Sequence, residues 1–180
     1  MDNKINVYGN IPKNYVLDKE KSREITGYAS IDKPWQKFYK VIPTKKIDLK
    51  QTVYEMVFDQ ENMDAPALGF LGVELTYKQL KEYVDQLAEA LIKNGIKQDD
   101  VVLMGVANSV ETIISLLAIN KIGAVSKWFD IRANKKNIED YANSSNCKCM
   151  IAFDMLIPKI TDAIENTSLK KIIIVNPAGF

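Results

Sequence analysis

Two adjoining stretches decide the fold of this chain: LTYKQLKEYVDQLAEALIKNG (residues 75–95) and DDVVLMGVANSVETIISLLAINKIGAVSKWFDIR (residues 99–132). The first opens with Thr76, whose hydroxyl can cap a helix while Gln79 reaches back to the cap, the pattern of a capping box. Apolar residues then follow at helical spacing: Leu80, Val84, Leu87, Ala88, Leu91 and Ile92. Gly95 follows the last residue of this apolar pattern, and glycine is common just after the end of a helix. The first stretch therefore predicts an amphipathic helix.

The second stretch changes from a strand pattern to a helix pattern and back. Residues 101–106 form a continuous apolar run, which is typical of a parallel strand covered on both faces. Asn108 can cap the next helix, with Glu111 three residues later. The buried stripe of that helix would consist of Val110, Ile113, Ile114, Leu117 and Ile122. Gly123 then ends the helix, and residues 124–129 form the next strand.

The same alternation continues toward the C-terminus. We expect a helix over residues 135–144, a strand over 148–153, a helix over 154–165 and a strand over 171–175. Strands that alternate with helices through short connections favour right-handed crossovers and a mostly parallel sheet. The predicted fold class is α/β, with a mostly parallel sheet that carries helices on both faces.

Toward the N-terminus the signals are shorter. Residues 52–60 predict a helix with Val53, Met56 and Val57 on its buried face, and residues 67–76 predict a short hairpin turning at Gly72. Residues 1–47 show no sustained periodicity, so we expect an irregular N-terminal arm followed by one α/β unit over residues 48–180. Four aromatic residues of the arm either pack along the main body or belong to a partly disordered leader: Tyr28, Trp35, Phe38 and Tyr39.

Composition excludes several classes of function. The chain contains no histidine, which removes Ser-His-Asp and Cys-His catalytic arrangements and four-ligand Cys/His zinc sites. A formal net charge of +1 gives no field that would attract nucleic acid or an anionic membrane. No apolar run is long enough for a membrane helix. The only cysteines, Cys147 and Cys149, are spaced for a reduced core strand rather than a disulfide. We expect a cytoplasmic protein.

Ligand-binding residues are expected in the turns after the predicted strands, because parallel sheets bind ligands at the carboxyl ends of their strands. None of these turns contains a dinucleotide fingerprint or the common nucleotide phosphate loop. Trp128, Phe129, Asp130 and Arg132 follow one strand and are the candidates for the edge of an acyl or CoA pocket. The alternative is a surface turn with an exposed Asp-Arg pair and packed aromatics. We expect no catalytic, cofactor-binding or metal-binding residue in this chain beyond these pocket-edge candidates.

Four segments together carry a resemblance to a known family. LTYKQL at residues 75–80 resembles the "LTYxEL" motif of the adenylate-forming enzymes, the AMP-dependent synthetases and ligases that include the acyl-CoA synthetases. AINKIGAV at residues 118–125 is similar to their "LKAGA" turn, and GVANSVE at residues 105–111 is similar to their "LPNSPE" segment. GYASIDKPW at residues 27–35 resembles the leader of some bacterial members. Ile131 departs from the pattern, since many members have proline there.

The resemblance implies the N-terminal part of an ATP-dependent acid-thiol ligase. In this family a carboxylate attacks the α-phosphate of ATP to give an acyl-adenylate and pyrophosphate, and a thiol such as CoA then takes the acyl group. The family's phosphate loop, adenosine-binding residues, Mg²⁺-binding acidic residue and catalytic lysine normally follow the region where this chain ends at Phe180. We therefore expect this piece to be inactive alone, with ATP, Mg²⁺ and CoA used by the parent protein.

Other interpretations stay open at this point. The expected partners of a ligase piece are the remainder of the parent enzyme and a small carboxylic acid, and apolar surface left exposed would favour self-association. A complete, non-catalytic α/β module that binds a protein or small ligand through residues 128–132 is the main alternative. A flavodoxin-like or response-regulator-like protein is suggested only by the βαβ alternation. The residues identify neither the acid that is activated nor whether the acceptor is CoA or a carrier protein.

Overall fold

The computed structural model describes residues 26–32 and 50–177. Internal contacts divide the chain into two units, residues 1–47 and residues 48–180. In the first unit, helix α1 spans Ala29–Asp32, and the Asp32 carboxylate accepts hydrogen bonds from the backbone N–H groups of Thr26 and Gly27. Tyr28 is exposed. The other three aromatic residues proposed as packing contacts, Trp35, Phe38 and Tyr39, lie outside the described residues.

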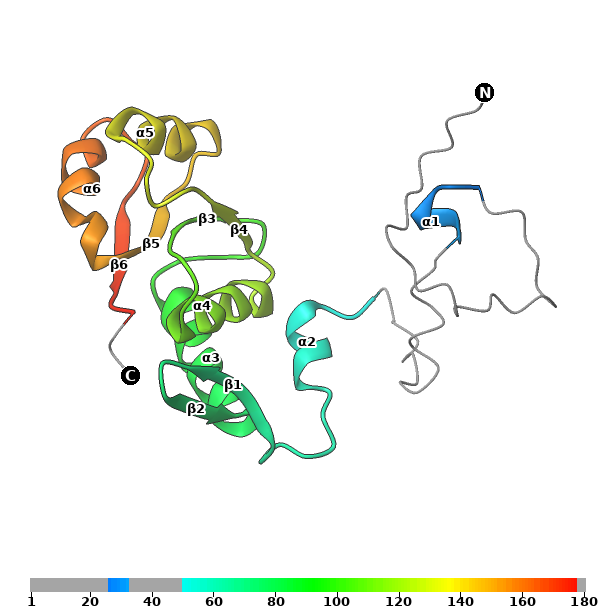
Figure 1. Cartoon of the computed structure of the whole chain (residues 1–180). Coiled ribbons are helices and arrows are strands. Elements are labelled where there is room, and N and C mark those ends of the chain that lie inside the picture. Colours follow the sequence, from blue (N-terminus) through cyan, green and yellow to red (C-terminus); the bar gives the residue numbers. More distant parts are fainter. Residues whose placement is uncertain (1–25, 33–49, 178–180) are drawn as a thin grey trace, which may run out of the picture. The chain divides into compact units, whose positions relative to one another are not determined.

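The second unit is built around a parallel sheet, as the sequence predicts. Its strands are β3 (Val101–Gly105), β4 (Val125–Trp128), β5 (Cys149–Phe153) and β6 (Lys171–Val175), and their order in the sheet is β4-β3-β5-β6. All three strand pairs are parallel. Helices α4 (Val110–Lys121), α5 (Lys135–Ser144) and α6 (Ile157–Ile164) connect consecutive strands, and the 3-10 helix η3 (Asp154–Leu156) precedes α6. Figure 1 shows these elements in the main body of the chain.

Alternating side chains of the sheet belong to two separate cores. Val102 and Met104 of β3 pack with α4 and with helix α3 (Tyr77–Lys93) in one cluster. Leu103, between them, packs with α5 and α6 in the other cluster. Because successive side chains of a strand point to opposite faces, this division places α3 and α4 on one face of the sheet and α5 and α6 on the other. The prediction of helices on both faces is confirmed.

The hairpin and the first long helix form as their residues dictate. Strands β1 (Pro66–Phe70) and β2 (Val73–Thr76) are antiparallel and turn at Leu71-Gly72, where both residues have positive φ. Two positive φ values in a two-residue turn match the right-handed twist of a hairpin, and glycine accepts this conformation without strain. Thr76 then caps α3 through a complete capping box with Gln79. Gly95, with a φ of 84°, follows the Asn94 C-cap.

The cap of α4 differs from the prediction by one residue. Ser109, not Asn108, occupies the N-cap position, and its Oγ accepts a hydrogen bond from the N–H of Thr112. The Thr112 hydroxyl in turn donates to the carbonyl oxygen of Ala107. Both Asn and Ser are favourable caps, so local preference alone does not separate them. Glu111 therefore takes no part in a capping box.

Two predicted helix faces also need correction. Helix α2 spans Val53–Phe58, but Val53 and Met56 are exposed, and the packed side chains are Tyr54, Val57 and Phe58. Both sets have helical spacing, and the set that packs carries two aromatic rings, Tyr54 and Phe58, whose centroids are 4.9 Å apart and which offer a large apolar surface. At the end of α3, Ile92 is exposed because the buried stripe ends at Leu91.

Candidate functional site

The end of β4 and the turn that follows it hold the four pocket-edge candidates, but the four side chains do not form one surface. Trp128 is partly exposed, and its indole N–H donates to Ser126 Oγ at 3.2 Å. Phe129 turns into the core and is only 6% exposed. Asp130 and Arg132 form an exposed pair with a shortest N···O distance of 2.5 Å. The sequence thus identified a strand-end turn, whose exposed part consists of Trp128, Asp130 and Arg132.

The Asp130–Arg132 pair has the electrostatics of a surface ion pair. Hydrogen bonds from the Arg132 side chain and backbone hold the pKa of the Asp130 carboxyl well below its usual range, and the same pair raises the pKa of Arg132. Both residues therefore stay charged at neutral pH. The guanidinium already donates to both oxygens of the carboxylate. Arg132 would have to leave this pair in order to bind an incoming phosphate or carboxylate with its full set of donors.

Phe129 is held in the core by a glycine on the neighbouring strand. A Cβ atom added at Gly105, the last residue of β3, would lie 2.5 Å from Cζ of Phe129 and 3.0 Å from a methyl carbon of Leu156. The absence of a side chain at Gly105 is what lets the phenyl ring cross the end of the strand. The ring also stacks near Tyr141 of α5, at a centroid separation of 6.1 Å. Phe129 thus fixes the start of the turn.

Lys127 ties the same strand to the end of α5. Its Nζ donates to the carbonyl oxygen of Tyr141 at 2.9 Å, to Ser144 Oγ at 2.8 Å and to Ser145 Oγ at 2.6 Å. Cations are favourable at a helix C-terminus, where carbonyl groups lack partners. Lys127 therefore has a structural role in the described part of the chain.

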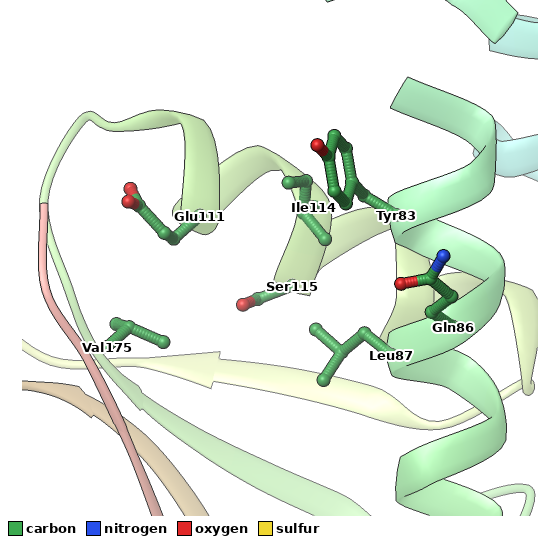
Figure 2. Close-up of a pocket in the computed structure, with 7 residues that line it drawn as sticks. All are labelled: Tyr83, Gln86, Leu87, Glu111, Ile114, Ser115 and Val175. Carbon is green, nitrogen blue, oxygen red and sulfur yellow. The ribbon is translucent and has the colours of Figure 1, made fainter. Parts of the chain in front are cut away.

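A groove lies on the face of the sheet that is covered by α3 and α4. The sequence predicted no site there. The groove has a volume of about 350 Å³ and is bordered by α3, α4 and the end of β6. The lining residues, drawn in Figure 2, are Tyr83, Gln86, Leu87, Glu111, Ile114, Ser115 and Val175. We call it the α3–α4 groove. Glu111 was expected to support the cap of α4, and Ser115 gave no signal because it lies within an apolar helix pattern.

Two polar atoms in the α3–α4 groove lack partners within the described residues. Glu111 Oε2 and Ser115 Oγ are both shielded from solvent and have no hydrogen bond. The Ser115 side chain belongs to a residue only 1% exposed. Buried polar groups are nearly always hydrogen-bonded in folded proteins, so each exception calls for a physical explanation.

The described residues contain no cluster of typical metal-ligand side chains. Within residues 26–32 and 50–177, no three His, Cys, Asp or Glu side chains come close enough together to hold a metal ion. Cys147 and Cys149 are buried free thiols, and burial raises the pKa of both, that of Cys149 to about 11. A thiol of high pKa is a poor nucleophile and metal ligand. The same ranges contain no helix with the length and apolar character needed to cross a membrane.

A family model and curated relatives both show what this chain is similar to. A family model described as "AMP-binding enzyme" matches residues 57–179. The 2-succinylbenzoate–CoA ligase of Listeria innocua is 29% identical over 111 residues, covering 62% of this chain and 24% of the relative. Tyrocidine synthase 1 of Brevibacillus parabrevis is 30% identical over 88 residues, which cover 49% of this chain and 8% of that protein.

Solved structures give the same picture of the fold. An anthranilate CoA ligase in complex with anthranoyl-AMP superimposes with a TM-score of 0.67 at 19% identity, covering 72% of this chain and 26% of that one. A benzoate CoA ligase from Burkholderia xenovorans gives a TM-score of 0.66 at 19% identity, over 71% of this chain and 26% of the other. The chain thus spans about a quarter of the length of these CoA ligases.

Proposed function

Because this chain belongs to the AMP-binding enzyme family, we propose that it forms the N-terminal part of an ATP-dependent acid-thiol ligase. The observation that carries the proposal is the family match over residues 57–179, which contains the whole hairpin and parallel sheet. The reaction class is adenylation of a carboxylic acid followed by transfer of the acyl group to a thiol. We further propose residues 1–47 as an arm and residues 48–180 as the subdomain that the rest of the ligase completes.

In this proposal the described residues supply a scaffold and not the chemistry. Within residues 26–32 and 50–177 the turns after the strands carry no glycine-rich phosphate loop, and no three His, Cys, Asp or Glu side chains gather to hold a metal ion. We therefore propose that the rest of the parent protein holds ATP and Mg²⁺. Adenylyl transfer depends on groups that position the reactants and neutralise charge. We therefore assign no reaction step to a side chain of this chain. The second candidate, a complete non-catalytic binding module, has no specific observation in its favour.

The test is carboxylate-dependent exchange of pyrophosphate into ATP. The complete reading frame that contains this sequence should support exchange with at least one member of a panel of aromatic, fatty and amino acids. The 180-residue chain alone should support none. Aromatic acids are included first because relatives of this chain include CoA ligases for 2-succinylbenzoate and 4-coumarate. A complete protein that folds but exchanges pyrophosphate with no acid would contradict the proposal.

The exposed part of the turn after β4 is proposed to border the acyl or CoA site of the complete enzyme. Trp128 and Arg132 are the side chains to change, since Phe129 is buried in the core. In the complete enzyme, Trp128→Ala and Arg132→Ala should raise KM for the acid or the thiol while the melting temperature stays close to that of the unchanged enzyme. Lys136→Ala, at an exposed position of α5, is the matched control. Unchanged KM values for both substrates would show that the turn is only a surface connection.

The remaining proposals concern location and association. We propose a cytoplasmic location for the parent protein, because Cys147 and Cys149 suit a reducing compartment, and no nucleic-acid partner, because the charge of this chain is balanced. Large apolar side chains on the two edge strands are exposed, Val125 and Trp128 on β4 and Ile174 on β6. Exposed sheet edges pair readily with other chains. We therefore expect the isolated chain to self-associate, which sedimentation velocity over a concentration series would detect.

A further inference from the structure

The end of α3 carries the only Asn-Gly pair in the sequence. Asn94 is the C-cap residue of the helix and is exposed, and Gly95 follows it with a φ of 84°. Asparagine is one of the thermally labile side chains, because the backbone nitrogen of the next residue can attack its amide carbon. A following glycine has no Cβ atom to hinder that attack, and its backbone turns easily. The pair is therefore chemically prone to spontaneous deamidation.

The reaction exchanges one amide for another within the chain and then consumes water. The Gly95 nitrogen gives its proton to a base in the solvent and forms a bond to Asn94 Cγ. The bond from Cγ to Nδ2 breaks, and Nδ2 takes up a proton and leaves as ammonia. Water then opens the succinimide at either of its two carbonyl groups, which gives aspartate or isoaspartate. Two groups must therefore be free, the Gly95 N–H and the Asn94 side-chain amide.

In the folded chain both reacting groups are held by hydrogen bonds. The Gly95 N–H donates to the carbonyl oxygen of Ile92 at 2.8 Å, as in a Schellman helix stop. Nδ2 of Asn94 donates to the carbonyl oxygen of Ala90 at 2.8 Å. Lys171, the first residue of β6, donates from Nζ to Asn94 Oδ1 at 3.1 Å and also to the backbone carbonyl oxygen of Asn94. Ring closure turns the Asn94 side chain toward the Gly95 nitrogen and breaks these bonds, so the native fold opposes it.

We propose that Asn94 is a deamidation site controlled by the fold: its amide is lost when the end of α3 opens, and Lys171 keeps that end closed. Asn94 and Lys171 are 77 positions apart, so this clamp exists only in the tertiary structure. Helix ends open locally at a smaller cost in free energy than the whole fold. A cation beside the last carbonyl groups of a helix is favourable, and opening must also break that contact. The clamp is independent of the ligase proposal, since none of the pocket-edge residues takes part in it.

The two products should differ in their effect on the helix end. Aspartate leaves the main chain unchanged and can still accept from Lys171, whereas isoaspartate inserts a methylene group into the main chain before Gly95. That insertion displaces the N–H of Ile96, which donates to the carbonyl oxygen of Leu91 at 3.0 Å and belongs to a residue only 5% exposed. Chain that has formed isoaspartate should therefore unfold at a lower temperature than Asn94→Asp. Equal midpoints would overturn this part of the proposal.

The test incubates the 180-residue chain at pH 8 in water enriched in ¹⁸O, with and without guanidinium chloride. Hydrolysis of the succinimide then incorporates ¹⁸O, so tandem mass spectrometry distinguishes it from deamidation during later digestion in ordinary water. Asn94 should deamidate faster in denaturant than in the native chain, by on the order of tenfold or more, because opening limits the native reaction. Asn108, which precedes Ser109, is the exposed comparison and should react more slowly than Asn94 in denaturant. Equal rates at Asn94 in the two solutions, or a rate in denaturant no higher than that of Asn108, would overturn the proposal.

Substitutions test the clamp. Lys171→Ala should raise the native rate at Asn94 several-fold and leave the rate in denaturant unchanged, because the clamp exists only in the folded chain. Lys170→Ala changes the exposed neighbouring residue and is the matched control, which should leave both rates unchanged. The native rate at Asn108 in the same sample reports global unfolding and should not rise. Equal native rates at Asn94 for Lys171→Ala and Lys170→Ala, or a rise that Asn108 shares, would refute the clamp.

Discussion

Asp85 of α3 joins three helices, and its removal is the sharpest test of how they are held together. Its carboxylate accepts hydrogen bonds from Tyr54 of α2 at 2.8 Å, from Lys81 of α3 at 2.7 Å and from Lys121 of α4 at 2.7 Å. Asn120 of α4 adds a second link by accepting from the backbone N–H of Tyr54 at 2.8 Å. Asp85→Asn would keep the shape of the side chain and remove its charge.

The size of the effect follows from the pKa of Asp85. Partial burial by itself would raise this pKa, but the hydrogen bonds from Lys121, Lys81 and Tyr54 outweigh burial and lower it from 3.8 to about 2. A tenfold change in proton affinity is worth ~1.4 kcal/mol, so the upper value is about 2.5 kcal/mol. The Asp85 side chain is 31% exposed, and solvent screening reduces the expected contribution to about 1–2 kcal/mol.

The sign of the pH dependence is fixed by the direction of the pKa change. The pKa of Asp85 is lower in the folded state than in the unfolded state, so its contribution is complete above the unfolded value of 3.8. The contribution is lost as the pH falls from about 4 through about 2. The difference in unfolding free energy between the unchanged chain and Asp85→Asn should thus be largest at neutral pH and shrink below pH 4.

Urea denaturation at pH 7, 4 and 3, followed by circular dichroism, measures this difference. Asp162→Asn, at an exposed position of α6, is the matched control and should cost little at any of these pH values. Asp85 does not hold the helices together if Asp85→Asn destabilises the chain no more than Asp162→Asn at pH 7. The lowered pKa of Asp85 is likewise contradicted if the cost of Asp85→Asn is as large at pH 3 as at pH 7.

Three further predictions concern the core and the caps. Gly105→Ala should lower the unfolding free energy by about 1–3 kcal/mol, because the new methyl group would overlap the ring of Phe129. Urea denaturation measures this loss. An unchanged unfolding midpoint would mean that the Phe129 ring moves away freely. Ser109→Ala should cost about 1 kcal/mol, whereas Asn108→Ala should cost clearly less; equal costs in thermal unfolding would argue against Ser109 as the cap. The Cys149 thiol should react with Ellman's reagent at pH 8 only after denaturant is added, since the thiol is buried and its pKa is raised to about 11. Rapid labelling of the native chain would contradict the burial of this thiol.

Local sequence determined most of the secondary structure. The helix over 135–144 and the strand over 171–175 have the bounds that the residues predict. The capping box at Thr76 and the glycine turn at residue 72 also formed as expected. These features depend on residues within a few positions of one another, which is why pattern and capping rules suffice for them.

The errors in the sequence-based predictions arose where two local solutions are equally good. Asn108 and Ser109 are both able to cap α4, and the hydrogen bond from Thr112 to Ala107 accompanies the choice of Ser109. Two faces of α2 are apolar, and contact with α3 and α4 selected the one that carries Tyr54. For α2 the deciding partner is therefore another part of the fold.

The sequence by itself determined the α/β class, the order of the strands along the chain and the family, because these follow from periodicity, capping residues and motifs that are contiguous in the chain. Only the tertiary structure decided that Phe129 is core while Trp128 is surface, since that division depends on Gly105 of the neighbouring strand. It alone also brought Leu87, Glu111 and Val175 around one groove. Groups far apart in sequence become a site only when the packing of helices on a sheet removes them from water together.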